Sequence, residues 1–124
     1  LGDVYKRQAQ NEASGPDQSV YDAINQLRRR PDINMPEVPK GLTKDQMREV
    51  IRRERRIELT FEGLYYSDIL RWKTAEKENN GMMHNYDGIE VVKRSFNPKR
   101  DYLWPIPYNQ TVLNPNLEQN PNWD

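Results

Sequence analysis

The positions of the prolines constrain this chain more than any other feature of its sequence. Eight of the nine prolines fall in two clusters, three at positions 31–39 and five at positions 98–121. Proline removes a backbone donor and pushes the residue before it away from helix. The first cluster therefore predicts an extended connector over residues 31–41 that separates two helices. The second predicts an irregular tail of extended chain and turns.

The segment after Pro16 predicts the first of these helices. Asp17 or Ser19 can serve as its N-cap, because a short polar side chain can accept a hydrogen bond from the free amides of a first turn. Apolar residues follow at helical spacing. They are Val20, Ala23, Ile24 and Leu27.

The second predicted helix has the strongest local signal. Thr43 and Gln46 have the spacing of a capping box, and apolar residues recur along one face up to Leu64. This pattern predicts a helix that runs to Glu62 or Gly63. A further helical segment is predicted over residues 65–72, and Asn79-Asn80-Gly81 is expected to end it.

The remaining segments predict little regular structure. Asp87-Gly88 ahead of the apolar residues at 89–92 is typical of a short β-hairpin. In the tail, a patch at residues 102–106 is expected to pack on a helical body. The predicted fold class is therefore mostly α, with long irregular proline-rich loops and one short hairpin.

Charge and composition exclude several classes of partner and chemistry. Nineteen basic residues balance nineteen acidic ones, so no general field attracts nucleic acid, and no nucleic-acid partner is expected. The chain has no cysteine, which excludes disulfides and thiolate metal sites. No apolar run reaches the length of a membrane span. The first eight residues, LGDVYKRQ, look like an adapter-derived peptide, so residues 1–16 are expected to be a disordered or artefactual leader.

Two glutamates in the second helix occupy an unusual position. At about 100° per residue, Glu54 and Glu58 fall within the apolar arc of that helix. Buried carboxylates are costly unless paired, so we expect them to bind arginines or the amides of the proline-rich tail. The alternative is a glycosidase acid and nucleophile. Two neighbours on one helix face, however, leave little room for a sugar between them.

The other polar groups give weaker indications. A stripe of arginines on the same helix could follow the phosphates of a nucleic acid, but a solvated or salt-bridged face is the simpler interpretation. These residues are Arg48, Arg52, Arg55 and Arg56. His84 is the only histidine and is expected in a loop, which leaves a metal site with few ligands. Ser67 and Asp68 lack the motif of a nucleophile elbow. No catalytic residue, metal site or cofactor is therefore predicted.

Aromatic side chains are the remaining candidates for ligand contact, because a flat ring with a polar edge can stack on a ligand and still reach water. Trp72 and Trp104 have apolar neighbours and are expected to pack. Tyr86, Tyr108 and Trp123 lie in polar segments and are expected to be freer.

Two strings in the chain resemble the signatures of the SusD/RagB family. The first is ERRIELTFEG at residues 54–63, followed by Asp68-Ile69 and Arg71-Trp72. The second is YLWPIP at residues 102–107, followed by Asn114-Pro115-Asn116-Leu117 and Gln119-Asn120-Pro121. They stand in the family's order and spacing. Tyr65 departs from the basic residue that many members have at that position.

The resemblance implies that residues 17–124 are the C-terminal region of an incomplete domain, whose parent carries tetratricopeptide-like helix pairs. It also implies that the helix-borne glutamates and arginines hold the C-terminal loop. Family members are lipid-anchored at the outer membrane of Bacteroidetes, where they pass glycans or other nutrients to a SusC-like TonB-dependent transporter. The implied function is binding without catalysis, with the anchor upstream and no ligand-contacting residue assigned. A helical protein–protein interaction module without a small-molecule ligand remains the alternative.

Overall fold

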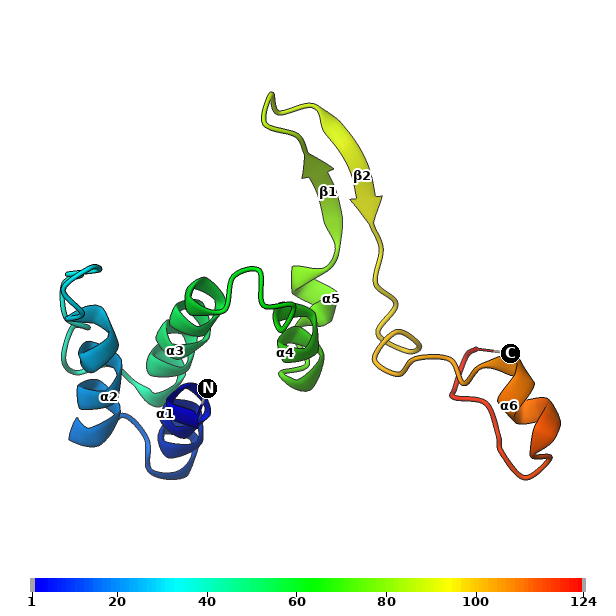
Figure 1. Cartoon of the computed structure of the whole chain (residues 1–124), viewed down its shortest axis with the longest axis horizontal. Helices are drawn as coiled ribbons and strands as arrows, with labels where there is room; N and C mark the ends of the chain where they lie inside the picture. Colours follow the sequence, from blue (N-terminus) through cyan, green and yellow to red (C-terminus); the bar gives the residue numbers. More distant parts are fainter. Residues whose placement is uncertain (1, 124) are drawn as a thin grey trace. The chain divides into compact units, whose positions relative to one another are not determined.

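The computed structural model describes residues 2–123 and divides the chain into two units, residues 1–62 and 63–124. The first unit contains helices α1 (Gly2–Ser14), α2 (Gln18–Arg28) and α3 (Lys44–Glu58). The second contains α4 (Tyr65–Arg71), α5 (Ala75–Glu78), strands β1 (Gly81–His84) and β2 (Glu90–Arg94), and α6 (Tyr108–Leu113) (Figure 1). The prediction of a mostly helical chain with one short hairpin is confirmed.

Helix α2 begins where the sequence predicted. The Asp17 side chain accepts a hydrogen bond from the backbone N–H of Val20 at 3.2 Å and so caps the first turn. The buried face of α2 packs on the connector and on α3. The core residues of this unit are Val20, Tyr21, Ile24, Val38, Met47 and Ile51.

The connector between α2 and α3 is held mainly by side chains of α2. After a turn at residues 31–33 it is largely extended, as predicted. The Asn25 side-chain oxygen accepts a hydrogen bond from the backbone N–H of Val38 at 2.9 Å. The Tyr21 hydroxyl accepts one from the backbone N–H of Leu42 at 3.0 Å. These bonds satisfy backbone donors that a proline-rich segment cannot pair within itself.

Helix α3 begins as predicted but ends earlier. The Thr43 hydroxyl accepts from the Gln46 backbone N–H at 3.2 Å, and the Gln46 side chain accepts from that of Thr43 at 2.9 Å. The predicted end at Glu62 or Gly63 is wrong, because the helix stops at Glu58. Phe61 then adopts a left-handed backbone with φ of +70° and Gly63 follows at +74°, so the helical path cannot continue.

Helix α1 differs from the expectation of disorder for residues 1–16, since residues 2–14 are helical. The alternative, an artefactual leader, stays a prediction. The side chains of Arg7 and Asn11 are buried, and the Asn11 amide donates to the backbone carbonyl of Lys44 at 3.2 Å. The helix is polar and is held against α3 largely by hydrogen bonds and ion pairs. The sequence of α1 therefore has no apolar periodicity that would indicate a helix.

The second unit begins with two short helices in place of the single predicted one. Helix α4 ends at Arg71, and Lys73 takes a left-handed φ of +57° before α5 starts. The sequence predicted that this helical region ends at residues 79–81. That position matches the end of α5 at Glu78, whereas α4 ends earlier, at Arg71. Ile69 and Ala75 form the small core of this unit with Phe96.

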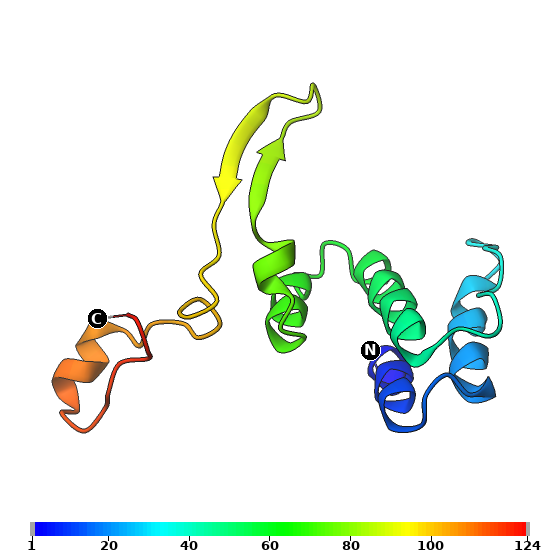
Figure 2. The same ribbon diagram turned by 180° about the vertical axis from the view of Figure 1, so that it is seen from behind.

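The hairpin lies where Asp87-Gly88 predicted it. Strands β1 and β2 are antiparallel, with an irregularity between Met83 and His84. At the turn, the Asn85 side-chain oxygen accepts from the backbone N–H groups of Asp87 and Ile89 at 3.0 and 2.9 Å. Every residue of both strands is exposed within the described chain. Figure 2 shows the ribbon from behind.

The tail differs from its prediction in two respects. Helix α6 was missed, although Pro107 directly before it is a suitable neighbour of a helix start. The patch at residues 102–106 packs only in part. Tyr102 lies partly buried against Phe96, with ring centroids 4.9 Å apart. The expectation is wrong for Leu103 and Trp104, which are 52% and 70% exposed.

Candidate functional site

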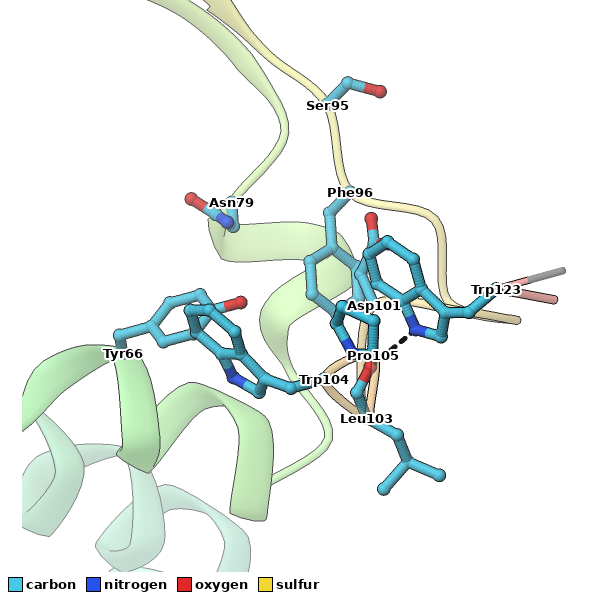
Figure 3. Close-up of a pocket in the computed structure, with 9 residues that line it drawn as sticks. All are labelled: Tyr66, Asn79, Ser95, Phe96, Asp101, Leu103, Trp104, Pro105 and Trp123. Carbon is cyan, nitrogen blue, oxygen red and sulfur yellow. Dashed lines mark hydrogen bonds between the residues drawn. The ribbon is translucent and has the colours of Figure 1, made fainter. Parts of the chain in front are cut away.

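An open cavity in the second unit, which we call the aromatic cleft, is the strongest candidate site. Its volume is about 250 Å³. Figure 3 shows side chains from α4, from the segments on either side of the hairpin and from the tail. The lining residues are Tyr66, Asn79, Ser95, Phe96, Asp101, Leu103, Trp104, Pro105 and Trp123.

Two aromatic rings form one wall of the aromatic cleft. The Tyr66 and Trp104 rings meet edge to face, with centroids 6.3 Å apart and planes at 87°. This is a favoured geometry for aromatic pairs, because the ring edge is positive and the ring face negative. Trp104 keeps most of its surface exposed despite the contact. Its indole is therefore available to stack on a flat ligand.

Phe96 anchors the base of the aromatic cleft. Its side chain is buried, and its backbone N–H donates to the side-chain oxygen of Asn80 at 2.7 Å. The Asn80 amide returns a hydrogen bond to the Phe96 carbonyl at 3.3 Å. Tyr102 packs on Phe96, and the Lys73 ammonium lies 4.2 Å from the centroid of the Tyr102 ring. These contacts fix one end of the tail on the small core.

Asp101 is the one charged residue among the nine described residues that line the cleft. Its carboxylate accepts hydrogen bonds from the Arg100 guanidinium at 2.6 Å and from the backbone N–H of Asn97 at 2.7 Å. These bonds, that from Arg100 first, lower the pKa of the Asp101 carboxyl below its ordinary value. The group is therefore a carboxylate at neutral pH and presents only acceptor oxygens to the cleft.

Two further polar groups line the cleft with free hydrogen-bonding capacity. The side chains of Asn79 and Ser95 have no hydrogen-bond partner among residues 2–123. An amide offers two donors and one acceptor oxygen, and a hydroxyl offers both functions. The arrangement can therefore combine ring stacking with hydrogen bonds to a polar ligand.

Four residues at the end of the chain, which we call the C-terminal clasp, hold the segment that carries Trp104. The Gln119 amide donates to the Ile106 carbonyl at 2.9 Å and accepts from the Ile106 N–H at 2.7 Å. The other bonds all run from a side-chain N–H to a backbone carbonyl. They are Asn120 to Trp104 at 2.6 Å, Asn122 to Lys99 at 2.8 Å and Trp123 to Leu103 at 2.8 Å.

The two predicted core-facing glutamates lie in the first unit and are both paired. Glu54 binds Arg28 of α2, and Glu58 binds Arg7 of α1 at 2.9 Å. The expectation of arginine partners is confirmed. These partners come from neighbouring helices and not from the proline-rich tail. Each carboxylate is engaged by a guanidinium, so the pair does not form the two facing groups that a glycosidase requires.

The arginine stripe is salt-bridged, as its simpler interpretation predicted, but one member is not at the surface. Arg48 donates to Glu12 of α1 at 2.7 Å, and Arg52 donates to Glu49 at 3.2 Å. Arg55 is only 1% exposed. Its guanidinium lies 4.2 Å from the centroid of the Tyr5 ring and donates to the Tyr5 hydroxyl at 3.0 Å. Helix α1 covers this side of α3.

The groups considered for metal binding or nucleophilic catalysis form no such site. His84 is the last residue of β1, so its expected place in a loop is wrong. Asp68 is buried and accepts from the Arg71 side chain at 2.8 Å. Among residues 2–123, no three histidine, cysteine, aspartate or glutamate side chains lie close enough to hold a metal ion.

The aromatic predictions are partly confirmed. Tyr86 and Tyr108 are highly exposed, as expected, and Trp123 is partly buried. Trp72 is partly buried as well, but Trp104, expected to pack, forms the open wall of the cleft. Sequence reasoning missed Tyr66, Asn79, Ser95 and Asp101 as site residues. No spacing pattern links them, because separate segments bring them together.

Residues 8–123 match the model of the SusD family. SusD-like protein P2 of Formosa agariphila is 32% identical over 118 residues, which are 91% of this chain and 22% of that protein. A SusD homolog from Bacteroides thetaiotaomicron has a TM-score of 0.74 at 30% identity, over 98% of this chain and 25% of its own.

A SusD-like carbohydrate binding protein from Bacteroides fragilis is 35% identical, with a TM-score of 0.71. The likeness covers 82% of this chain and 24% of that one. The chain therefore spans about a quarter of the length of the relatives it matches. Over residues 2–123, no helix has the length and apolar character needed to cross a membrane.

Proposed function

The chain belongs to the SusD family, and from this premise we propose that its protein binds a carbohydrate or related nutrient without covalent chemistry. The observation that carries the proposal is the family match over residues 8–123. The relative from Bacteroides fragilis described as carbohydrate binding supports the choice of ligand class. The aromatic cleft adds a surface in this chain with the chemistry that such a ligand needs.

The location and the partner follow as parts of the same proposal. Residues 17–124 form the C-terminal region of a longer protein. A lipid attached to that protein upstream of this region anchors it to the outer face of the outer membrane. The protein captures oligosaccharide there and passes it to a SusC-like TonB-dependent transporter. The coverage of only about a quarter of the relatives supports the placement within a longer chain.

A binding role without catalysis agrees with the state of the carboxylates. Glu54 and Glu58 are engaged by arginines, and the Asp101 carboxylate accepts two hydrogen bonds. General acid catalysis requires a carboxyl group that holds its proton near neutral pH. The lowered pKa of Asp101 works against that role.

The binding proposal can be tested by affinity electrophoresis of the full-length protein. Each gel contains a single polysaccharide. Starch, xyloglucan, galactomannan, laminarin and alginate form a suitable panel. We expect retardation by at least one polysaccharide and no release of reducing sugar from it. Migration unchanged on every gel would favour the alternative, a helical protein–protein interaction module.

The transport proposal needs a separate measurement. Purification of the tagged full-length protein from its native outer membrane should recover a TonB-dependent transporter in stoichiometric amount. If the protein is retarded by a glycan but purifies without a transporter, the proposed binding function stands and the proposed delivery to a transporter is contradicted.

A further inference from the structure

We infer that Ile57 and Phe61, which we call the docking patch, are covered by the N-terminal part of the same polypeptide, the part that precedes residue 17 in the longer protein. The inference rests on the proposed placement of residues 17–124 within such a protein. It depends on an exposed ring and a strained backbone at Phe61, and on the length of polypeptide outside this chain.

The exposure of the docking patch is the first observation. Phe61 is completely exposed, whereas the other phenylalanine of the chain, Phe96, is only 5% exposed. Ile57 lies four residues earlier, near the end of α3, and is 57% exposed. Large apolar side chains gain free energy when they leave water. Two of them exposed within one short segment indicate a surface that another part of a protein covers.

The backbone of Phe61 is the second observation. Its φ of +70° lies in the left-handed region, where the Cβ atom of an L-residue crowds a carbonyl oxygen. The other non-glycine residues with positive φ among residues 2–123 are Asn34, Lys73 and Asn122, and asparagine tolerates this region better than a bulky residue does. Glycine would satisfy the turn without steric cost. A phenylalanine here is therefore explained only if its ring makes a favourable contact.

The turn after α3 holds the docking patch in place. The Thr60 backbone N–H donates to the Ile57 carbonyl at 3.3 Å, and the backbone N–H of Glu62 donates to the Leu59 carbonyl at 3.1 Å. The Thr60 hydroxyl also donates to the Arg56 carbonyl at 2.8 Å. A turn that is already closed by hydrogen bonds loses little conformational entropy when another surface covers it.

The surroundings of the docking patch are typical of a protein interface. Arg53 lies one helical turn before Ile57, and Thr60 directly precedes Phe61. Both are exposed polar residues. An apolar centre with a polar rim is the usual composition of a surface that contacts protein.

The strain at Phe61 identifies which protein covers the docking patch. An unfavourable backbone is present in every folded molecule, so the contact that offsets it must be permanent as well. A partner that binds and leaves would expose the ring again. This chain matches 22% of one relative and 25% of another, so about three quarters of such a protein lies outside the matched part. That polypeptide is always attached, which makes it the occupant that fits best.

Phe61→Gly in the full-length protein tests the inference by the sign of its effect. Glycine relieves the backbone strain, so a variant whose lost ring touched nothing should be at least as stable as the wild type. If the N-terminal part covers the ring, its loss should lower the urea midpoint by about 0.5–1 M, and we expect this fall. A midpoint equal to or above that of the wild type overturns the inference.

Asn34→Gly is the matched control for this change. Asn34 is another residue of the first unit with a positive φ, +43°, and it is exposed without a large apolar side chain. Its replacement should leave the urea midpoint unchanged or raise it slightly. An equal fall in both variants would show that glycine itself destabilises these turns, and the inference would be overturned.

Hydroxyl-radical footprinting of the wild type decides the inference even if Phe61→Gly does not fold. The full-length protein is labelled as a monomer and without a transporter. Phe61 should react several times more slowly in the folded protein than in the unfolded one. Equal reactivity in both states overturns the inference. Protection that appears only at high protein concentration, or only with a transporter, overturns it as well, because a second copy or the transporter then covers the ring.

Photocross-linking identifies the polypeptide that covers the docking patch. Arg53→p-benzoylphenylalanine places a photoreactive group beside the patch and leaves Phe61 in position. Irradiation of the full-length monomer should join this position to a peptide that precedes the region matched by residues 17–124. Any other product, or none, overturns the inference. The proposed function is judged separately, since a wild type that binds glycan keeps that function whatever covers Phe61.

Discussion

The Glu54 carboxylate on α3 accepts a hydrogen bond from the Arg28 guanidinium on α2, and the two side chains are only 11% and 15% exposed. The Arg28 Nε also donates to the Pro36 carbonyl at 2.6 Å. One arginine therefore ties together α2, the proline-rich connector and α3. Loss of its anionic partner would leave a nearly buried cation, and that is costly.

The first prediction concerns this pair. Glu54→Ala should lower the free energy of unfolding by roughly 2–3 kcal/mol, because it leaves Arg28 unpaired in a largely buried place. Urea unfolding of the full-length protein, followed by circular dichroism, measures the loss. Glu49→Ala is the control, since the Glu49 side chain is 73% exposed in its pair with Arg52, and it should change stability by less than about 1 kcal/mol. Equal effects of both changes would contradict the structural role of Glu54.

A second prediction tests how the connector is held. Asn25 is buried, and its side-chain oxygen is the hydrogen-bond acceptor for the backbone N–H of Val38. Asn25→Ala leaves that buried donor without a partner and should cost about 1–3 kcal/mol. Gln26→Ala on the exposed side of α2 is the matched control. Hydrogen exchange at the Val38 amide should accelerate in the first variant only. Unchanged protection would show that the bond does not hold the connector.

A third prediction concerns the C-terminal clasp. Gln119→Glu keeps the size of the side chain but replaces the N–H that donates to the Ile106 carbonyl with an anionic oxygen. The two acceptors then repel each other, so the amide of Ile106 should exchange faster and the near-ultraviolet signal of the tryptophans should change. Gln110→Glu in α6 introduces the same charge at an exposed position and should leave both signals unaltered. No difference between the variants would mean that the clasp does not position Trp104.

A fourth prediction concerns acid. The hydrogen bond from the Arg48 guanidinium lowers the pKa of the Glu12 carboxyl below its ordinary value. At low pH the unfolded chain therefore binds a proton more readily than the folded one. The stabilisation is complete above the ordinary glutamate pKa of about 4.3 and is lost as the pH falls through the lower, folded value.

The measurement for this fourth prediction is the urea midpoint at neutral pH and in acid. The midpoint should fall in acid for the wild type and fall less for Glu12→Gln, which removes the titrating group. Glu62→Gln, in the exposed turn after α3, should behave like the wild type. The same acid dependence in Glu12→Gln and wild type would show that other carboxylates cause the loss. Asp17 and Asp101 also have lowered pKa values.

The elements that sequence reasoning predicted correctly are those with a local cause. The caps at Asp17 and Thr43 and the hairpin turn at Asn85 depend on contacts within three or four residues. Such contacts leave a recognisable spacing in the chain. The end of α3 has no comparable signal, because Phe61 is a residue type that rarely adopts a left-handed backbone.

The error in placing Arg55 has its origin in α1. Arg55 was assigned to an outer stripe because the residues that cover it lie fifty positions away in a segment without apolar periodicity. Tyr5 contacts its guanidinium through the ring face and the hydroxyl. An arginine that is buried by a polar helix cannot be distinguished from a surface arginine by helical phase alone.

The candidate site was not predictable as a unit. Trp104 and Trp123 were considered as aromatic residues, but the more exposed of the two was expected to pack. Tyr66 comes from α4, and Asn79 and Ser95 come from the two sides of the hairpin. Their proximity depends on how the hairpin returns the chain to the small core at Phe96. That return is a tertiary feature, and the spacing of residues along the sequence does not encode it.

The clasp also affects how the tail behaves at high protein concentration. Leu103, Trp104 and Ile106 form a short, partly exposed apolar segment of the kind that can recruit a strand from another molecule. Side chains already occupy the carbonyls of all three residues, and the prolines at 105 and 107 have no N–H to offer. The backbone of this segment therefore offers few free hydrogen-bonding groups to a foreign strand, so the Trp104 ring can face solvent with a reduced risk of aggregation.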